Sequence, residues 1–437
     1  MGGAIVIENG LVVPDPDQDG LLDGGRVVVE GGRIAAVAAA GAAPWTFPPR
    51  TFPNPVPAGA TRIDATGCAV LPGLVSCHAH SRPFRGLGDG LGMMAWHDRF
   101  VHRFSARMTA EDAWFGAANT FLEMLRNGIT TVQVMTSITV VEEAEVAAAT
   151  EAGIRARLVP HVVERADIEA TIARIEAEAD ADAGERVRTW LGLEVPEIAA
   201  VDTMRLVAEA AERLGVGVHT HFAEFAPGDL DRLAQAGLLR EGLSLAHCVH
   251  LSERDIRRLA ERGVSVSHNP RSNSRYGNGV APLRRLLDAG VVVGLGTDGP
   301  DSTFSCDVFE EARLAAFLAR ATARDPGALT AAEALGLATT GGARALGLDD
   351  QIGRLEPGAR ADVIVVDLTS PSFAPVLAAG PHRNLVPLLV FAAVGRDVRD
   401  VVVDGRLVLR DRAFQTLDAA RVVAECRRRA ERILAAM

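Results

Sequence analysis

The chain has 437 residues, of which 48% are hydrophobic and 23% are charged, and its net charge at pH 7 is −11. This length exceeds a single barrel of roughly 250 residues and leaves room for a second module, while the apolar content suits a large core. The acidic balance, without a dense basic run, argues against nucleic acid as a partner, because phosphate binding needs a concentrated positive surface.

The basic and sulfur-containing residues exclude several chemistries. All 45 basic residues are arginine, so Schiff-base catalysis, P-loops and metal bridges made by a carbamylated lysine are excluded. The five cysteines are scattered and form no CxxC pair, which indicates free thiols in a reducing compartment. The sequence begins without a signal-peptide pattern, and no apolar run reaches the ~18 residues of a membrane span. We therefore expect a cytoplasmic protein without a membrane segment.

The N-terminal part of the chain is rich in β-branched residues. Residues 4–8 and 26–38 are predicted to be strands, with turns at Gly24-Gly25 and at Gly31-Gly32. The following segment, residues 41–60, is rich in proline and alanine and is predicted to be a loop.

The C-terminal part has a similar pattern. Residues 362–367 (DVIVVD) and 398–409 (VRDVVVDGRLVL) are predicted strands, and Asp404-Gly405 folds the second segment into a hairpin. Because both ends are β-rich, we expect residues 1–69 and 353–437 to pair into one small composite β-sandwich domain.

Between these ends, in residues 70–352, apolar strand-like runs alternate with amphipathic helical stretches. Eight runs are found, near residues 70–77, 129–135, 155–161, 189–195, 216–221, 243–248, 263–267 and 291–297. Eight alternating units predict an α/β fold of the closed (β/α)8 TIM-barrel type. An open doubly wound sheet is the alternative, but it would carry a glycine-rich phosphate loop after its first strand, where this chain reads HAH.

Histidines and one aspartate lie where the predicted barrel strands end; they are His78, His80, His219, His221, His247, His268 and Asp298. The C-terminal ends of parallel barrel strands meet on one face, and residues two apart on a strand point the same way, so His78 and His80 can reach one ion. Imidazole and carboxylate ligands suit zinc or iron(II). Three neutral imidazoles and one carboxylate leave a divalent ion with net charge near +1, which lowers the pKa of bound water to about 7 in favourable sites.

Several motifs resemble those of the amidohydrolase superfamily, and more narrowly its chlorohydrolase and nucleobase-deaminase branch. They are HAH (78–80), HTHFAE (219–224), AHCVH (246–250), SHNPRSN (267–273) and GTDG (296–299). The stretch GRLEPGARADVIVVD (353–367) resembles the return of that family into its small β-domain. The resemblance covers nearly the whole chain. It implies a metal-dependent hydrolase with a small-molecule heterocyclic substrate, and a homo-oligomer, since family members are often dimers or larger.

The resemblance also implies residue roles. One divalent ion, zinc first and iron as the alternative, would be held by His78, His80, His221 and Asp298. Asp298 would also take a proton from the attacking water, Glu224 would be the proton shuttle, and His247 would orient the nucleophile or the developing charge. Deamination needs two proton-handling groups on different sides of the reacting carbon, which Glu224 and Asp298 can supply from different strands. Dechlorinating relatives often lack the glutamate, so its presence favours deamination.

Two positions depart from the adenosine-type deaminases of this branch. Where those carry a purine-contacting histidine after the fourth strand, this chain reads LEVPE (193–197) and has Glu194. An ionised carboxylate only accepts hydrogen bonds, so Glu194 favours a ring edge that donates, unless it pairs with an arginine instead. Where those deaminases hold ribose hydroxyls with a glutamate, this chain has Ser105, and its segment from His80 to Arg85-Gly86 is shorter. Both departures favour a free heterocycle over a ribonucleoside.

The remaining polar residues have less specific interpretations. Arg85, beyond the shortened segment, is a candidate for substrate binding, and His219 for substrate binding or for support of the ligands. Asn273 is expected to fix its loop or the floor of the site. Supporting hydrogen bonds are expected from His250 and His268, and His97 and His102 lie in a segment that could roof the pocket.

The sequence thus predicts hydrolytic deamination of an aminopyrimidine, aminopurine, pterin or triazine-like ring, with release of ammonia. Hydrolysis of a cyclic amide, or of a chloro or thioether substituent on such a ring, is one alternative, and an adenosine-type nucleoside deaminase is another. A non-catalytic metal-binding scaffold is a rival from a different class, and the presence of both Glu224 and Asp298 argues against it.

Overall fold

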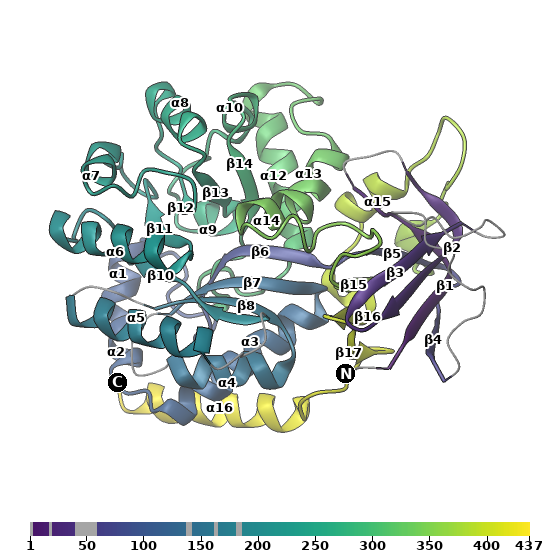
Figure 1. The fold of residues 1–437 in the computed structure, drawn as a ribbon, viewed down its shortest axis with the longest axis horizontal. Helices are drawn as coiled ribbons and strands as arrows, with labels where there is room; N and C mark the ends of the chain where they lie inside the picture. The colour runs from purple at the N-terminus through teal and green to yellow at the C-terminus, as the bar shows by residue number, and fades with distance from the viewer. Residues whose placement is uncertain (1–2, 17–19, 40–58, 137–141, 161–164, 181–185) are drawn as a thin grey trace.

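The computed structural model describes residues 3–16, 20–39, 59–136, 142–160, 165–180 and 186–437. Most of the segment expected to be a proline-rich loop, residues 41–58, lies outside the described residues. Figure 1 shows a barrel surrounded by helices, with a second, strand-rich part on one side. The predicted α/β fold, a TIM-type barrel with a β-sandwich fed from both chain ends, is confirmed.

The strand-rich part is one sheet to which both ends of the chain contribute. Its order is β18-β17-β16-β15-β5-β1-β2-β3, with β4 beside β1. The strands are β1 (Ile5–Val12), β2 (Leu22–Glu30), β3 (Arg33–Ala38), β4 (Thr61–Asp64), β5 (Cys68–Pro72), β15 (Val363–Asp367), β16 (Val398–Val403), β17 (Arg406–Arg410) and β18 (Ala413–Phe414). Antiparallel pairing of β5 with β15, with Val70 opposite Val365, joins the two chain ends. The domain boundaries expected at residues 69 and 353 stay predictions.

The turns of this sheet test the glycine-based predictions. Asp404 and Gly405 both have positive φ, at 51° and 72°, and form the predicted hairpin between β16 and β17. Gly31-Gly32 is the turn between β2 and β3, as predicted. The turn predicted at Gly24-Gly25 is wrong, because both glycines lie inside β2. A Cβ on Gly25 would lie 2.5 Å from Val12 Cγ2, so this glycine serves the close approach of two strands.

Eight parallel strand positions, each called a stave, form the barrel among the described residues, and two short strands share one of these positions. The staves are β6 (Leu74–Ala79), β7 (Ile129–Met135), β8 (Arg155–Val159), β9 (Val187–Thr189) continued by β10 (Leu191–Leu193), β11 (Val218–Phe222), β12 (Leu243–His247), β13 (Ser265–His268) and β14 (Val292–Leu295). Around Trp190 the fourth stave changes partners. The Trp190 N–H donates to the Leu158 carbonyl at 2.7 Å, and the Leu191 N–H donates to the Gly217 carbonyl at 3.2 Å. The Asp298 N–H closes the ring by donating to the His78 carbonyl at 3.0 Å.

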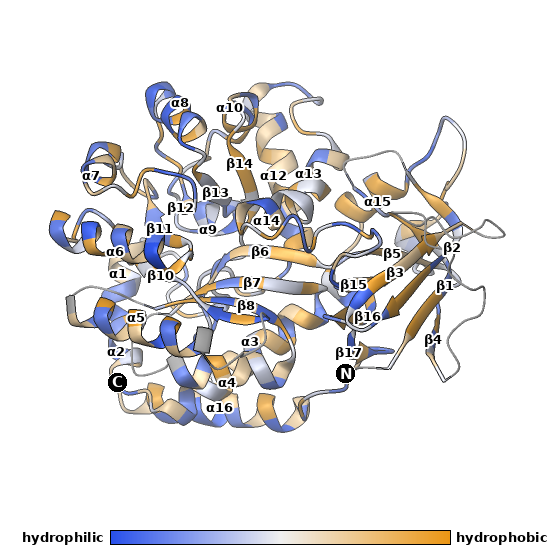
Figure 2. Ribbon diagram, in the orientation of Figure 1, coloured by the Kyte–Doolittle hydropathy of each residue, from blue (hydrophilic) through white to orange (hydrophobic). Residues whose placement is uncertain are grey.

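Helices cover the barrel, and several of them begin at residues whose side chains cap the first turn. Reciprocal capping boxes start α3 (Ala110–Arg126), α8 (Glu253–Glu261) and α13 (Ala331–Leu337). The outward face of α8 is hydrophilic in Figure 2, while β6 is largely hydrophobic. The longer remaining helices are α4 (Glu142–Ala152), α5 (Arg165–Asp180), α6 (Val201–Leu214), α12 (Val308–Ala323), α15 (Leu385–Phe391) and α16 (Ala419–Ala435). No helix within the described ranges combines the length and apolarity required to cross a membrane.

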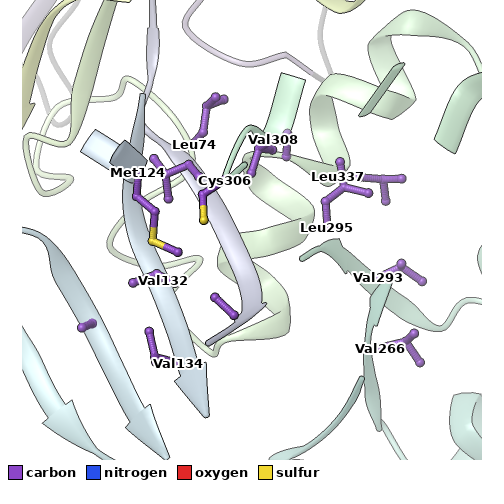
Figure 3. Close-up of a cluster of buried hydrophobic side chains, with 14 of the residues drawn as sticks. Leu74, Met124, Val132, Val134, Val266, Val293, Leu295, Cys306, Val308 and Leu337 are labelled. Atoms are coloured by element: carbon purple, nitrogen blue, oxygen red, sulfur yellow. The ribbon is translucent and has the colours of Figure 1, made fainter. Parts of the chain in front are cut away.

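The main core lies between the staves and these helices. In Figure 3, Val132 and Val134 of β7 lie near Met124 of α3, and Val293 and Leu295 of β14 lie near Leu337 of α13. All are buried. A second, smaller core that includes Ile5, Val27, Ile34, Val363 and Val402 belongs to the composite sheet.

A buried ion pair connects the barrel to the composite sheet. Arg155 of β8 donates from Nε and Nη2 to the two oxygens of Asp362, each at 3.0 Å, and both side chains are almost fully buried. The Asp404 N–H of the β16–β17 hairpin also donates to Asp362, at 2.7 Å. Asp362 therefore links the bottom of the barrel to the hairpin of the sheet.

We predict that Asp362→Ala lowers the free energy of unfolding by about 3–5 kcal/mol, because the buried Arg155 guanidinium loses its bidentate carboxylate and keeps the longer contact with Asp404 Oδ1 at 3.4 Å. Urea unfolding followed by tryptophan fluorescence measures this loss. Glu431→Ala is the matched control, since the Arg427–Glu431 pair is largely exposed and should contribute nothing measurable. Equal unfolding midpoints for the two variants would contradict the prediction.

Candidate metal centre and active site

The four residues predicted as metal ligands come together at the C-terminal end of the barrel. His78 ends β6 together with His80, His221 lies in β11, and Asp298 follows β14. Each of the three histidines offers a ring nitrogen within 4.8 Å of the others, and His78 and Asp298 form a second such group with His247. Asp298 Oδ1 lies 3.9 Å from His78 Nε2 and 3.7 Å from His80 Nε2.

The imidazoles are oriented by neutral acceptors. His80 Nδ1 lies 2.7 Å from the Met135 carbonyl, and His221 Nδ1 lies 2.8 Å from the Glu194 carbonyl. A carbonyl only accepts, so in both rings Nδ1–H donates and Nε2 keeps its lone pair. Burial lowers the pKa of His78 and of His80, which keeps these rings neutral as metal ligands must be.

His78 Nε2 provides a test of whether the residues fit a metal ion. This nitrogen is fully buried and has no hydrogen-bond partner among the described residues. Leaving a buried polar atom unpaired costs about 1–3 kcal/mol, and a cation beside Asp298 would satisfy it. Three imidazole nitrogens and one carboxylate form a donor set that zinc or iron(II) accepts. The residues therefore fit a divalent ion.

Asp298 is held as an ionised carboxylate. Burial alone would raise its pKa, but the electrostatic interaction with the neighbouring His80 and His247 rings and the hydrogen bonds from Ser272 and Gly299 outweigh burial, so the pKa is lowered. The Ser272 hydroxyl donates to Oδ2 at 2.5 Å, and the Gly299 N–H donates to Oδ1 at 2.6 Å.

Glu224 is the opposite case. Its carboxyl group is buried and accepts one hydrogen bond, from Asn278 Nδ2 at 3.1 Å. Burial raises the pKa of Glu224 to about 8, so the group carries a proton at neutral pH. Oε1 lies 3.6 Å from His247 Nδ1, and this nitrogen lies 2.9 Å from Asn273 Oδ1. The cluster thus contains an ionised and a protonated carboxyl group at the same mouth of the barrel.

The five residues expected on the substrate side lie in different surroundings. Asn273 is buried against His247, and His219 is fully buried behind His78, with 2.9 Å between His219 Nε2 and His78 Nδ1. The Arg85 guanidinium pairs with Glu123 of α3 at 2.6 Å. Ser105 is the half-buried last residue of α2 (His102–Ser105). The half-buried Glu194 follows β10, and its charge acts on His80, on Arg82 and on His97.

The other histidines are less closely tied to the cluster. His268 is buried beyond His247, and burial lowers its pKa to about 4. His97 lies in the π-helical turn after α1 (Met93–Trp96), with its ring centroid 5.6 Å from that of His102. Burial, followed by the charge of Arg82, lowers the pKa of His97 to about 4.

Several residues that support the site were not predicted from the sequence. Ser272 and Asn278 donate to the two carboxyl groups, and Ser244 of β12 accepts from His219. The buried Arg82 pairs with the buried Asp301 at 2.7 Å. Ser272 lies inside the recognised SHNPRSN motif and could have been found there, whereas nothing in spacing marks the others.

Comparison with known proteins supports the same class of protein. The profile of the amidohydrolase family matches residues 69–408. A 5-methylthioadenosine/S-adenosylhomocysteine deaminase from Desulforudis audaxviator is 36% identical and aligns over 98% of this chain and 99% of the relative. A 5'-deoxyadenosine deaminase from Methanosarcina mazei is 34% identical, over 99% and 98% of the two chains. The crystal structure of an adenosine deaminase from Xanthomonas campestris with bound zinc has a TM-score of 0.88 and 30% identity, over 99% and 98% of the two chains.

The fold and the site together define a metal-dependent hydrolase built on a (β/α)8 barrel. The chain belongs to the amidohydrolase family. The expectation of a metal-dependent deaminase that acts on C–N bonds other than peptide bonds is confirmed.

The raised pKa of Glu224 predicts how the stability of the metal-free protein depends on pH. Folding keeps Glu224 protonated up to about pH 8, whereas the unfolded chain releases this proton near pH 4.5, so rising pH destabilises the fold between these values. Glu224→Gln removes this dependence and should raise the free energy of unfolding above pH 8 by on the order of 5 kcal/mol. The gain should vanish below about pH 4.5.

Differential scanning calorimetry of the metal-free protein between pH 4 and pH 9 measures this difference. Glu197→Gln, at an exposed position, is the control. It should change the free energy of unfolding only slightly and by the same amount at every pH. A Glu224→Gln effect that does not change with pH would refute the assignment of a buried, protonated carboxyl group.

Proposed function

We propose that this chain hydrolyses the exocyclic C–NH2 bond of an adenine-type nucleoside, with zinc as its metal ion, and releases ammonia. The observation that carries the proposal is the pair of carboxyl groups, ionised Asp298 and protonated Glu224, on different strands beside the histidine cluster. Zinc rather than iron is supported by the zinc in the adenosine deaminase structure.

The residues divide the proton transfers between them. His78, His80, His221 and Asp298 would hold the ion, which supplies Lewis-acid chemistry and lowers the pKa of water at the centre. Glu224 donates its proton to the ring nitrogen next to the reacting carbon, and Asp298 accepts a proton from the attacking water as the C–O bond forms. Asp298 then passes this proton to the departing amine, the C–N bond breaks, and the hydroxyl proton of the adduct returns to Glu224 as the carbonyl forms. The ring nitrogen keeps its proton, and ammonia leaves.

His247 would orient the adduct. Its Nδ1 lies 2.9 Å from Asn273 Oδ1, which only accepts, and 3.4 Å from the donor Asn269 Nδ2, and the shorter contact favours the proton of this neutral ring on Nδ1. Burial lowers the pKa of His247 and favours this neutral form. Nε2, next to the cluster, is then free to accept a hydrogen bond from the attacking water and to aim it at the substrate carbon.

The substrate class follows from the relatives rather than from the two departures in the sequence. Their names specify 5-methylthioadenosine, S-adenosylhomocysteine and 5'-deoxyadenosine, all adenine nucleosides, and so favour the nucleoside alternative over a free heterocycle. Glu194 supports a nucleoside as well. Its carboxylate, whose charge acts on Arg82 and His97, can accept hydrogen bonds from sugar hydroxyls as an anion, whereas the hydroxyl of Ser105 is neutral.

The first prediction from this proposal concerns substrate choice. The zinc-loaded enzyme should release ammonia from 5'-deoxyadenosine or methylthioadenosine with a kcat/KM at least about tenfold above that for free adenine, guanine, cytosine and melamine, because only nucleosides use the sugar contacts. An ammonia assay over this panel measures the ratio. Turnover restricted to free bases would reject the nucleoside and restore the free heterocycle, and no ammonia from any member of the panel would reject deamination.

The second prediction concerns Glu224. Glu224→Gln should lower kcat by roughly 10²–10⁴-fold, as the loss of a general acid does, with one zinc ion per chain still present by elemental analysis. Glu197 is exposed and lies shortly after β10, at the C-terminal end of the barrel, so Glu197→Gln serves as the control and should retain the wild-type rate. Wild-type turnover in the Glu224 variant would remove this residue from the mechanism.

A further inference from the structure

His219 forms the least expected contact of the cluster. It lies in β11, two residues before His221, and is fully buried. Its Nε2 lies 2.9 Å from His78 Nδ1, and its Nδ1 lies 3.1 Å from both the carbonyl and the hydroxyl oxygen of Ser244. One imidazole therefore connects His78 on β6 to Ser244 on β12.

This chain of contacts determines which nitrogen of each ring carries the proton. The Ser244 carbonyl only accepts, so His219 must donate from Nδ1. A neutral ring has one N–H, so His219 Nε2 is bare and accepts from His78 Nδ1–H. His78 is then left with a lone pair on Nε2, the buried nitrogen that lacks a partner among the described residues.

The opposite arrangement is disfavoured by the same contacts. If the Ser244 hydroxyl donated to His219 Nδ1, the lone pair of this nitrogen would face the carbonyl oxygen at 3.1 Å. His219 Nε2–H would then donate to His78, and His78 would carry its own proton on Nε2, 3.9 Å from Asp298 Oδ1. This form of His78 cannot bind a metal.

His78 differs from the other two ligand histidines in the nature of its acceptor. His80 and His221 donate to the backbone carbonyls of Met135 and Glu194, which no side-chain substitution can remove. His78 alone among the three donates to a side chain. All three acceptors are neutral, so with Asp298 as the one anionic ligand the net charge of a divalent centre stays near +1.

We propose that His219 is a positioning residue that locks His78 in the Nδ1–H tautomer and thereby sets the affinity of the site for its divalent ion. The inference rests on one part of the proposed function, which is that a divalent ion binds to the histidine cluster. His219 lies behind His78, fully buried, so it acts through His78 and does not contact substrate.

The test compares two substitutions of His219 in the full-length, metal-free protein, titrated with zinc alone against a chromophoric chelator. His219→Leu removes the acceptor and should weaken zinc binding about 10–100-fold, the usual effect of removing a partner that orients a ligand. His219→Gln offers an amide oxygen near the former Nε2 position and should recover most of the affinity. His268→Leu removes a buried histidine that forms no hydrogen bond with the His78 ring among the described residues, and it should leave zinc affinity unchanged.

Each outcome decides the inference. Equal zinc affinity in His219→Leu and the wild type would overturn it, and so would equal weakening in the Leu and Gln variants, which would indicate a packing role. If His219→Leu does not fold, ¹⁵N-histidine NMR of the metal-free wild type decides directly, because His78 must show a protonated Nδ1, and a protonated Nε2 would overturn the inference. No substrate is present in either experiment, so a failed deamination assay and a failed tautomer test are distinguishable.

Discussion

The site depends on closure of the barrel between its first and last staves. The Asp298 N–H donates to the His78 carbonyl, and this backbone bond holds the HAH pair and Asp298, the proposed carboxylate ligand, at the same edge although they are far apart in the sequence. The parallel register then positions the other members, because Phe222 lies opposite His247 and Ala246 lies opposite His221. A shift of one residue in this register would turn each of these side chains to the other face of its strand. The metal cluster is therefore a direct consequence of how the staves pair.

The residues that end the staves adopt a backbone conformation that costs energy. His247 and Asp298 have φ values of 74° and 57°, in the left-handed region, where a residue other than glycine costs on the order of 1–3 kcal/mol. Both are held there by their side chains. Asn273 fixes His247, and Ser272 together with the Gly299 N–H fixes Asp298. The left-handed conformation redirects the backbone away from the barrel at His247 and Asp298, where the side chains face the cluster.

The sequence predicted the parts of the structure that repeat or that are determined by local chemistry. Alternation of apolar runs located the eight staves, and Asp404-Gly405 located a hairpin because both residues tolerate positive φ. The grouping of His78, His80 and His221, the proposed ligands, was predictable because a strand end has one accessible face. Gly24-Gly25 was misread as a turn, since a glycine needed for close strand contact looks the same in sequence as one needed for a bend. Contacts such as Asn278 with Glu224, or Arg85 with Glu123, depend on loop paths that no periodicity encodes.

The two carboxyl groups show how one site maintains an acid and a base together. Both are almost completely buried, so burial alone would protonate both. Asp298 receives a hydroxyl and a backbone N–H and lies beside His80, and these interactions stabilise its anion more than burial opposes it. Glu224 receives one amide hydrogen bond and lies close enough to Asp298 and Glu194 for their charges to raise its pKa further. Ionisation of Asp298 thus helps to keep Glu224 protonated. Because this coupling acts between residues on different strands, it requires the same barrel register that brings the proposed metal ligands together, and the proposed proton chemistry and metal site therefore depend on one arrangement of strands.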